Sequence, residues 1–289
     1  MPEVQLSAGP IDYEDTGGDG PVVVLLHGLA MDASVWRHVI ADLRADHRCL
    51  APTLPIGSHR RPMRPDADLS MAGQAQIVAE FLERLDLRDV VLVANDLGVA
   101  QIVAGRFPER IGRLVLSSME AFDNYPPGLP GRTVALAGKL PGGVNLAVQP
   151  LRIRALRRLP TTYGLMSKRR VPDEITDRWL RPLLTQRAIR RDLKRYLSSV
   201  DRSEMLRAAE GLRAFDKPAL VVWAAEDRVM PREHGARLAA LLPQGRLVEI
   251  ADSRTLIPED QPAAFAAEIR AFAASAATTG REAGRSPSS

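Results

Sequence analysis

The chain has 289 residues, of which 45% are hydrophobic and 26% are charged, so it has the composition of a globular protein and the length for a large core. Lys and Arg exceed Asp and Glu by only 39 to 35, and the arginines are scattered, which argues against nucleic-acid binding. The single cysteine, Cys49, excludes a disulfide framework and makes a cysteine-based metal site unexpected.

The start of the chain lacks a basic segment followed by a long apolar run, so we expect no secretory signal. No window reaches the roughly 18 consecutive apolar residues of a membrane span, and we expect no membrane contact. We therefore expect a reducing, cytoplasmic setting. The small, polar residues 276–289 are expected to form a disordered tail.

Short apolar runs alternate with helical patterns in the first part of the chain. A hairpin is expected over residues 4–17, buried strands at 21–28, 48–54, 90–94 and 111–118, and helices at 32–46, at 68–87 and after the turn at 95–98. Asp32 or Ser34 and Asp68 or Ser70 are the candidate N-caps of the first two helices. This alternation predicts an α/β fold, a mostly parallel sheet with helices on both faces.

The pattern changes after Glu120 and returns after residue 213. Between these points, Pro and Gly clusters separate basic helical segments, and no clear strand is present. Strand and helix patterns then alternate again at 219–227, 231–243, 245–252 and 261–273. The sequence predicts one α/β core, residues 1–122 and 214–275, interrupted by a helical cap at 123–213.

Five segments in this order resemble the landmarks of the α/β-hydrolase superfamily, over about residues 1–275. They are "HGLA", "LPIGSHRRP", "ANDLG", "WAAEDRVMP" and "IADSRTLIPEDQP". The resemblance implies the α/β-hydrolase fold and a nucleophile at the apex of a strand–turn–helix elbow. An aspartate at that apex, Asp96, resembles the haloalkane dehalogenase and epoxide hydrolase branch.

A carboxylate at the elbow can attack a saturated carbon and form an alkyl-enzyme ester. It suits ester hydrolysis poorly, because attack on a carbonyl would give an anhydride. The chain has no Gly-x-Ser-x-Gly sequence that would supply a serine nucleophile. The alternative role for Asp96 is that of an N-cap for the following helix.

The resemblance assigns further residues to the site. His27 and Leu29 belong to the segment that supplies one arm of an anion hole, and the backbone N–H of Leu97 is the other arm. Dehalogenases typically carry a tryptophan after the nucleophile, whereas Leu97 has no side-chain donor. Trp36 could offer an indole N–H, or could only pack. Tyr163 and Tyr196 could donate protons from the cap, or be structural.

Two residues are candidates for the acid of the triad, Asp227 after the strand that follows the cap and Glu120 after the strand that precedes it. The decisive departure is at Thr255, which occupies the place where relatives carry histidine. A threonine hydroxyl cannot act as a general base near neutral pH, as imidazole can. His59, in the loop after "APTLP", is the candidate substitute, or a solvent-exposed loop residue.

Three functions remain open. The chain could be a hydrolase in which another group activates water, a cofactor-free acid/base catalyst such as a cyclase, isomerase, dehydratase or decarboxylase, or a protein that only binds a small molecule. We expect a small, largely apolar substrate, no cofactor and no metal. The cap arginines are interpreted as a solvated face. The oligomeric state is not fixed by the sequence, and a homodimer is one option.

Overall fold

Eight strands form a single sheet in the computed structural model, which describes residues 1–282. Their order is β1-β2-β4-β3-β5-β6-β7-β8. β1 and β2 form the expected antiparallel hairpin, β2 runs antiparallel to β4, and the remaining neighbours are parallel. The strands are β1 (Glu3–Leu6), β2 (Gly9–Asp15), β3 (Val22–Leu26), β4 (Arg48–Pro52), β5 (Val90–Asp96), β6 (Ile111–Met119), β7 (Ala219–Ala224) and β8 (Gly245–Ile250). The predicted α/β fold is confirmed.

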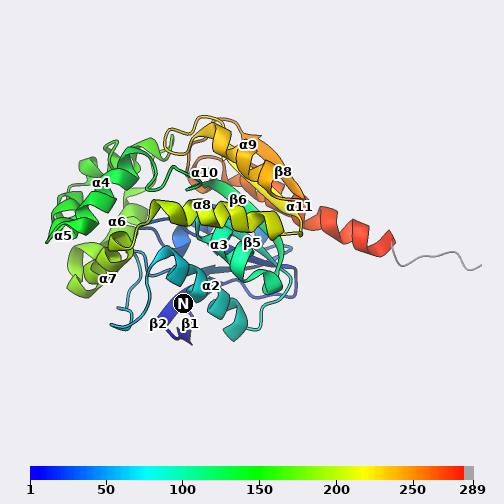
Figure 1. Cartoon of the computed structure of the whole chain (residues 1–289), viewed down its shortest axis with the longest axis horizontal. Helices are drawn as coiled ribbons and strands as arrows, with labels where there is room; N and C mark the ends of the chain where they lie inside the picture. The colour runs from blue at the N-terminus through cyan, green and yellow to red at the C-terminus, as the bar shows by residue number, and fades with distance from the viewer. Residues whose placement is uncertain (283–289) are drawn as a thin grey trace, which may run out of the picture.

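Helices cover the sheet in two groups (Figure 1). α1 packs against α11, whereas α2, α3, α8 and α9 form a contiguous series of neighbours. Asp32 and Ser70 are the caps, because their side chains accept hydrogen bonds from the backbone N–H groups of Ser34 and Gly73. The core helices are η1 (Ala33–Trp36), α1 (Arg37–Leu43), α2 (Met71–Arg84), α3 (Val99–Arg106), η2 (Pro108–Arg110), α8 (Arg202–Gly211), η6 (Leu212–Ala214), α9 (Arg232–Leu241), α10 (Ile257–Asp260) and α11 (Pro262–Glu282).

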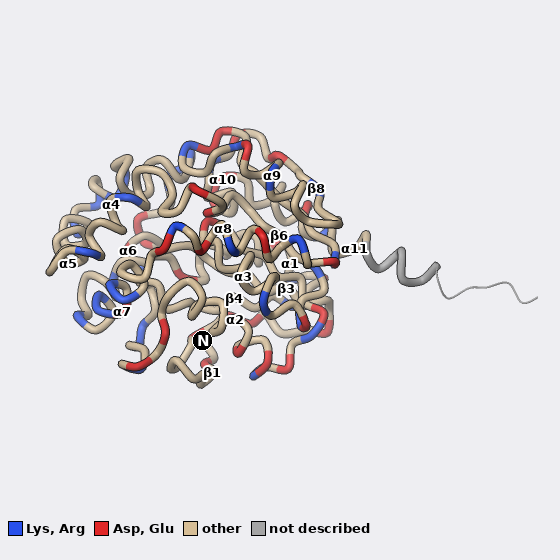
Figure 2. Tube along the Cα trace, in the orientation of Figure 1, with Lys and Arg blue, Asp and Glu red and all other residues tan. Residues whose placement is uncertain are grey.

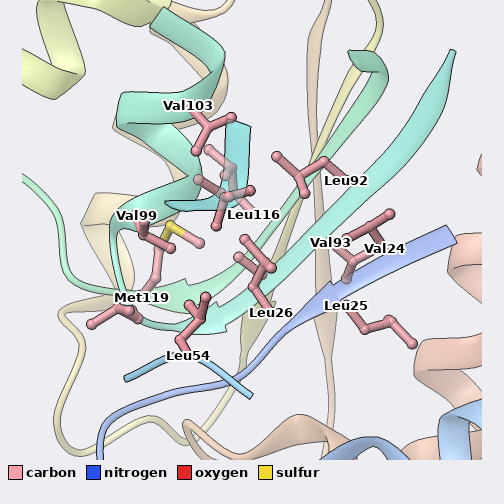
Figure 3. Close-up of a cluster of buried hydrophobic side chains, with 14 of the residues drawn as sticks. Val24, Leu25, Leu26, Leu54, Leu92, Val93, Val99, Val103, Leu116 and Met119 are labelled. Atoms are coloured by element: carbon pink, nitrogen blue, oxygen red, sulfur yellow. The ribbon is translucent and has the colours of Figure 1, made fainter. Parts of the chain in front are cut away.

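The hydrophobic core lies between the sheet and these helices (Figure 3). Strand residues such as Leu92 and Leu116 lie together with Val99 and Val103 of α3. Every residue of β5 is buried, as expected for a parallel strand that is covered on both faces. This packing fixes the carboxyl end of β5, where Asp96 lies.

The cap is entirely helical among the described residues. Its helices gather at one side of the core (Figure 1). They are α4 (Gly128–Lys139), α5 (Gly143–Val148), η3 (Gln149–Arg152), η4 (Arg154–Arg158), η5 (Tyr163–Leu165), α6 (Asp173–Thr185) and α7 (Arg187–Ser198).

The boundary expected at residue 213 needs correction, because α8 packs on the core helix α3 and not within the cap. Figure 1 shows α8 beside α3. The two helices approach closely, and a Cβ added at Gly105 would lie 3.2 Å from the Cα of Gly211. An amphipathic helix pattern shows that a helix has an apolar face but not which partner covers it. The cap therefore ends with α7.

The expected disordered tail, residues 276–289, also needs correction in part. α11 continues to Glu282, in keeping with the high helix propensity of its alanines. The rest of the expected tail, 283–289, lies outside the described residues. Within residues 1–282, no helix has both the length and the apolar character needed to cross a membrane.

Candidate active site

Asp96 ends β5 at the apex of a tight turn. Its φ of 71° is in the left-handed region, and the backbone N–H of Leu97 donates to the carbonyl of Asn95 at 2.9 Å. This three-residue turn is a strained conformation for a non-glycine residue. Such strain is retained only where the surrounding structure fixes it, here the buried β5 and the start of α3. The turn aims the side chain of Asp96 away from the sheet.

Two glycines make room for the turn. A Cβ at Gly28 would collide with the carboxylate of Asp96, and a Cβ at Gly98 would collide with Met205 and lie 3.0 Å from the carbonyl oxygen of Glu120. Both positions therefore require close backbone approach, which explains the small residues around the apex.

The two expected arms of the anion hole differ in the structure. The backbone N–H of Leu29 donates to Oδ2 of Asp96 at 3.3 Å, so this arm faces the carboxylate. The N–H of Leu97 is instead engaged by the carbonyl of Asn95, and Leu97 does not line the cavity described below. The role of the Leu97 N–H in an anion hole stays a prediction.

His27 holds the Leu29 loop and does not reach the cavity. Nε2 of His27 accepts from the backbone N–H of Leu54 at 2.8 Å, and its Nδ1 therefore donates to the carbonyl of Gly28, also at 2.8 Å. Burial lowers the pKa of His27 to about 4, so the imidazole is neutral at neutral pH.

A cavity of about 320 Å³ lies between Asp96 and the cap. Most of its wall is formed by Leu, Val, Ala, Pro and Met side chains from both sides of the cap–core boundary. The ionisable groups on the wall are Asp96, Glu120, Tyr125, Tyr163 and Tyr196. An apolar cavity with a few convergent polar groups is the usual form of a small-molecule site.

The carboxyl group of Asp96 is difficult to ionise. Burial raises its pKa to about 7, and the charge of Asp227 acts in the same direction, while the hydrogen bond from Leu29 opposes both. The carboxyl group of Asp96 therefore titrates near neutral pH instead of in the acidic range usual for aspartate.

Glu120 lies beside Asp96 on the cavity wall. Its backbone N–H donates to the carbonyl of Asp96 at 3.0 Å, and its Oε2 accepts from the N–H of Gly98 at 3.3 Å. Burial raises the pKa of Glu120 well above its usual range, and the charge of Asp96 raises it further. Glu120 is consequently harder to ionise while Asp96 is charged.

Tyr125 and Tyr196 also line the cavity. Burial raises the pKa of both phenols, so both keep their protons at neutral pH. Tyr125 is not among the tyrosines predicted from the sequence, because it does not lie well inside the insertion. Its signal was its place shortly after Glu120, at the entry to the cap.

The hydroxyl of Tyr163 is already engaged. It donates to the carbonyl of Ala30 at 2.8 Å, and the ring packs edge-on against Trp179 with centroids 5.6 Å apart. Tyr163 therefore lines the cavity, but its hydroxyl already donates a hydrogen bond to Ala30 and is not free to donate to a substrate.

Asp227 and Thr255 form a pair behind the cavity. The hydroxyl of Thr255 donates to Oδ1 of Asp227 at 2.8 Å, and the same oxygen accepts from the N–H groups of Val229 and Met230. Oδ2 of Asp227 is buried without a hydrogen-bond partner among the described residues. Thr255 is fully buried, and neither member of the pair lines the cavity. Of the two candidate acids, Glu120 is the one on the cavity wall.

Two predicted pocket residues lie elsewhere. Trp36 is fully buried in the core and stacks at a tilt against Phe265 of α11, with 5.9 Å between centroids. His59 is buried, not exposed, and its Nε2 lies 3.4 Å from Asp192 of α7, so it joins core to cap. Among the described residues, no histidine lines the cavity, and no cluster of three or more His, Cys, Asp or Glu side chains could hold a metal ion.

Comparison with known proteins agrees with this architecture. A model of the alpha/beta hydrolase family matches residues 23–268. A haloalkane dehalogenase of Mesorhizobium japonicum is 35% identical over 120 residues, which are 41% of this chain and only 38% of that protein. A cis-3-alkyl-4-alkyloxetan-2-one decarboxylase of Xanthomonas campestris is 25% identical over 283 residues, covering 91% of each chain.

Solved structures show the same fold. The crystal structure of a haloalkane dehalogenase from Bradyrhizobium elkani superposes with a TM-score of 0.76 at 20% identity, covering 94% of this chain and 97% of that one. The sheet order, the strained elbow and the matched range together show that the chain belongs to the alpha/beta hydrolase family.

Proposed function

We propose that this protein is a hydrolase that opens an epoxide on a small, apolar molecule, with Asp96 as the covalent nucleophile. The observation that carries the proposal is the placement of Asp96. It is a carboxylate at a strained apex, on the wall of an apolar cavity of about 320 Å³ that two protonated phenols also line. A nucleophile and a proton donor on the wall of one cavity are what ring opening at saturated carbon requires.

Epoxide opening fits these residues better than halide displacement. A leaving halide needs N–H donors, but Leu97 has no side-chain donor and Trp36 lies in the core. A leaving alkoxide needs a proton. Tyr125 and Tyr196 keep their protons at neutral pH, and the strongly basic alkoxide can take one as the ring opens.

The first step forms an ester. A carboxylate oxygen of Asp96 attacks a ring carbon, the carbon–oxygen bond of the epoxide breaks, and the released oxygen takes a proton from Tyr125 or Tyr196. The charge on Asp96 disappears as the ester forms.

The second step needs a base, and we assign it to Glu120. Burial and the charge of Asp96 hold the pKa of Glu120 high in the free protein. Esterification removes that charge, so the pKa of Glu120 falls and its proton passes to the phenolate left by the first step. The Glu120 carboxylate then takes a proton from water as the water attacks the ester carbonyl, and it returns that proton to the alcohol oxygen as the ester breaks down and the Asp96 carboxylate is restored. Burial remains, so this step is slow and the ester accumulates.

The test uses a panel of small aliphatic epoxides beside haloalkanes of matched size. We expect diol from the epoxides, an adduct on Asp96 in intact-protein mass spectra, and a longer-lived adduct in Glu120→Gln. Asp66→Asn, at an exposed carboxylate, is the matched control. Turnover that persists in Asp96→Asn, or an adduct that decays equally fast in Glu120→Gln and wild type, would contradict the assignment.

A second candidate is a cofactor-free acid/base reaction without hydrolysis. It is favoured by the pKa of about 7 at Asp96, which suits proton transfer near neutral pH, and by the absence of a histidine from the described cavity wall. One relative of similar length is named as a decarboxylase of an alkylated oxetanone. Turnover of such a four-membered lactone with loss of CO₂, and no adduct at any time, would select this candidate.

A further inference from the structure

A second cavity, of about 250 Å³, lies at the boundary between the cap and the loop after β8. Cap residues from η4 to the start of α6 form most of its wall, and Arg254 contributes from the core. Tyr163 lines both this cavity and the one above Asp96. The wall carries one carboxylate, Asp173, and seven cationic side chains: Arg154, Arg157, Arg158, Lys168, Arg169, Arg170 and Arg254.

Basic residues as such are common on the cap. Figure 2 shows Lys and Arg at several places near α4, α5 and α7. The cavity differs because its cations converge on one space from separate segments, and their mutual repulsion costs electrostatic energy unless anions compensate.

Ion pairs compensate these cations only in part. Arg154 and Arg157 share the carboxylate of Asp177, each at 2.6 Å. Lys168 and Arg169 likewise share Asp252, although Lys168 also reaches Glu226. Arg170 pairs with Asp173.

The remaining two arginines lack a carboxylate partner among the described residues. Arg158 is exposed and forms no ion pair there. The guanidinium of Arg254 reaches only the carbonyls of Gly164 and Ser167, both at 3.4 Å, and its buried Nε has no hydrogen-bond partner. A hydrogen bond from a bound acceptor would therefore stabilise this charged, unpartnered donor.

Asp260 holds the two walls in place. Its buried carboxylate accepts hydrogen bonds from the backbone N–H groups of Lys168, Arg169 and Arg254, at 2.9–3.0 Å, and from the hydroxyl of Ser167. Cap loop and core loop are thus fixed to one group, so the cationic side chains start from a preorganised frame.

We propose that this cavity is a binding site for a phosphoryl group. The wall carries seven cations, whereas four carboxylates form ion pairs with five of them and Asp260 adds a fifth carboxylate. The excess of positive charge suits a dianion, and arginine forks match phosphate oxygens in geometry. The phosphoryl group comes either from free phosphate or from the head of a longer molecule whose apolar part passes Tyr163 into the cavity above Asp96.

Isothermal titration calorimetry with inorganic phosphate tests the proposal by binding alone. Because no turnover is needed, the outcome for this site is independent of the outcome for the proposed reaction. Titrations use the full chain, with chloride at equal ionic strength as the reference. Saturable binding is expected, weakened about tenfold in Arg158→Gln and in Arg254→Gln. Arg187→Gln, an exposed arginine of α7 outside the cavity, is the matched control and should leave binding unchanged.

The proposed site would be refuted if phosphate does not bind. It would also be refuted if both cavity variants lose no more phosphate affinity than Arg187→Gln does. Because Arg158 is exposed, Arg158→Gln is expected to fold, and the result does not depend on Arg254 alone. A parallel titration with butyl phosphate identifies the source. Tighter binding than inorganic phosphate indicates the head of a longer molecule, and equal or weaker binding indicates the free anion.

Discussion

Asp96→Asn should stabilise the protein at alkaline pH although it removes the proposed nucleophile. Burial raises the pKa of Asp96 to about 7, so the folded protein binds this proton more tightly than the unfolded chain does. Ionising Asp96 is therefore unfavourable for folding. Its contribution lowers the free energy of unfolding as the pH rises from about 4 to about 7, and is constant above that. Asparagine stays neutral and can still accept from the N–H of Leu29.

The size of the effect follows from the same pKa. The distance from the usual aspartate pKa of about 3.9 to about 7 corresponds to roughly 4 kcal/mol, at 1.36 kcal/mol for each pKa unit. Urea unfolding at pH 4 and pH 8 measures it. The two proteins should differ by under about 1 kcal/mol at pH 4, and Asp96→Asn should be more stable by roughly 4 kcal/mol at pH 8.

Both proteins contain the same other titratable groups. The contributions of those groups to the pH dependence therefore cancel, to first order, in the difference between the two free energies of unfolding. Asp66→Asn, at an exposed carboxylate, is the control and should show no pH-dependent difference. If the difference between Asp96→Asn and wild type is the same at pH 4 and pH 8, the carboxyl of Asp96 is not held in the environment described above.

Three further predictions concern Asp96, the cavity tyrosines and the hydrogen bond between Thr255 and Asp227. The kcat/KM for an epoxide should rise with pH through about 7 and then level off, since Asp96 must be ionised to attack and the phenols keep their protons; a rise centred near pH 4 would contradict this. Tyr125→Phe and Tyr196→Phe should each lower kcat by at least about tenfold. Tyr163→Phe should change kcat little because its hydroxyl is bonded to Ala30, and equal losses in all three would refute the role of the other two tyrosines. Thr255→Val removes a donor to Asp227 and should lower the free energy of unfolding by about 1–3 kcal/mol, measured by urea unfolding at pH 7; an unchanged value would show that this hydrogen bond is not formed.

The sequence was sufficient for the fold because each element carried a local pattern. The uniformly apolar run of β5 and the helical spacing after Gly98 predicted the strand, turn and helix that the structure contains. α8 was misplaced because its pattern is equally amphipathic on a cap or on a core.

The site was less predictable because it depends on which side chains meet. Asp227 and Thr255 were expected in the site and do form a pair, but the pair is set behind the cavity. Glu120, equally acidic in sequence, lies on the wall. Tyr125 and the basic cavity were missed, since partners far apart along the chain decide whether a tyrosine faces a cavity or arginines converge.

The most direct test of the central role of Asp96 is a single turnover of an epoxide in ¹⁸O-labelled water, with enzyme in excess. Covalent attack predicts that the diol keeps only unlabelled oxygen and that a peptide containing Asp96 gains the label, because water attacks the ester carbonyl. Label in the diol and none in Asp96 would mean that water attacks the epoxide directly, and would contradict the account.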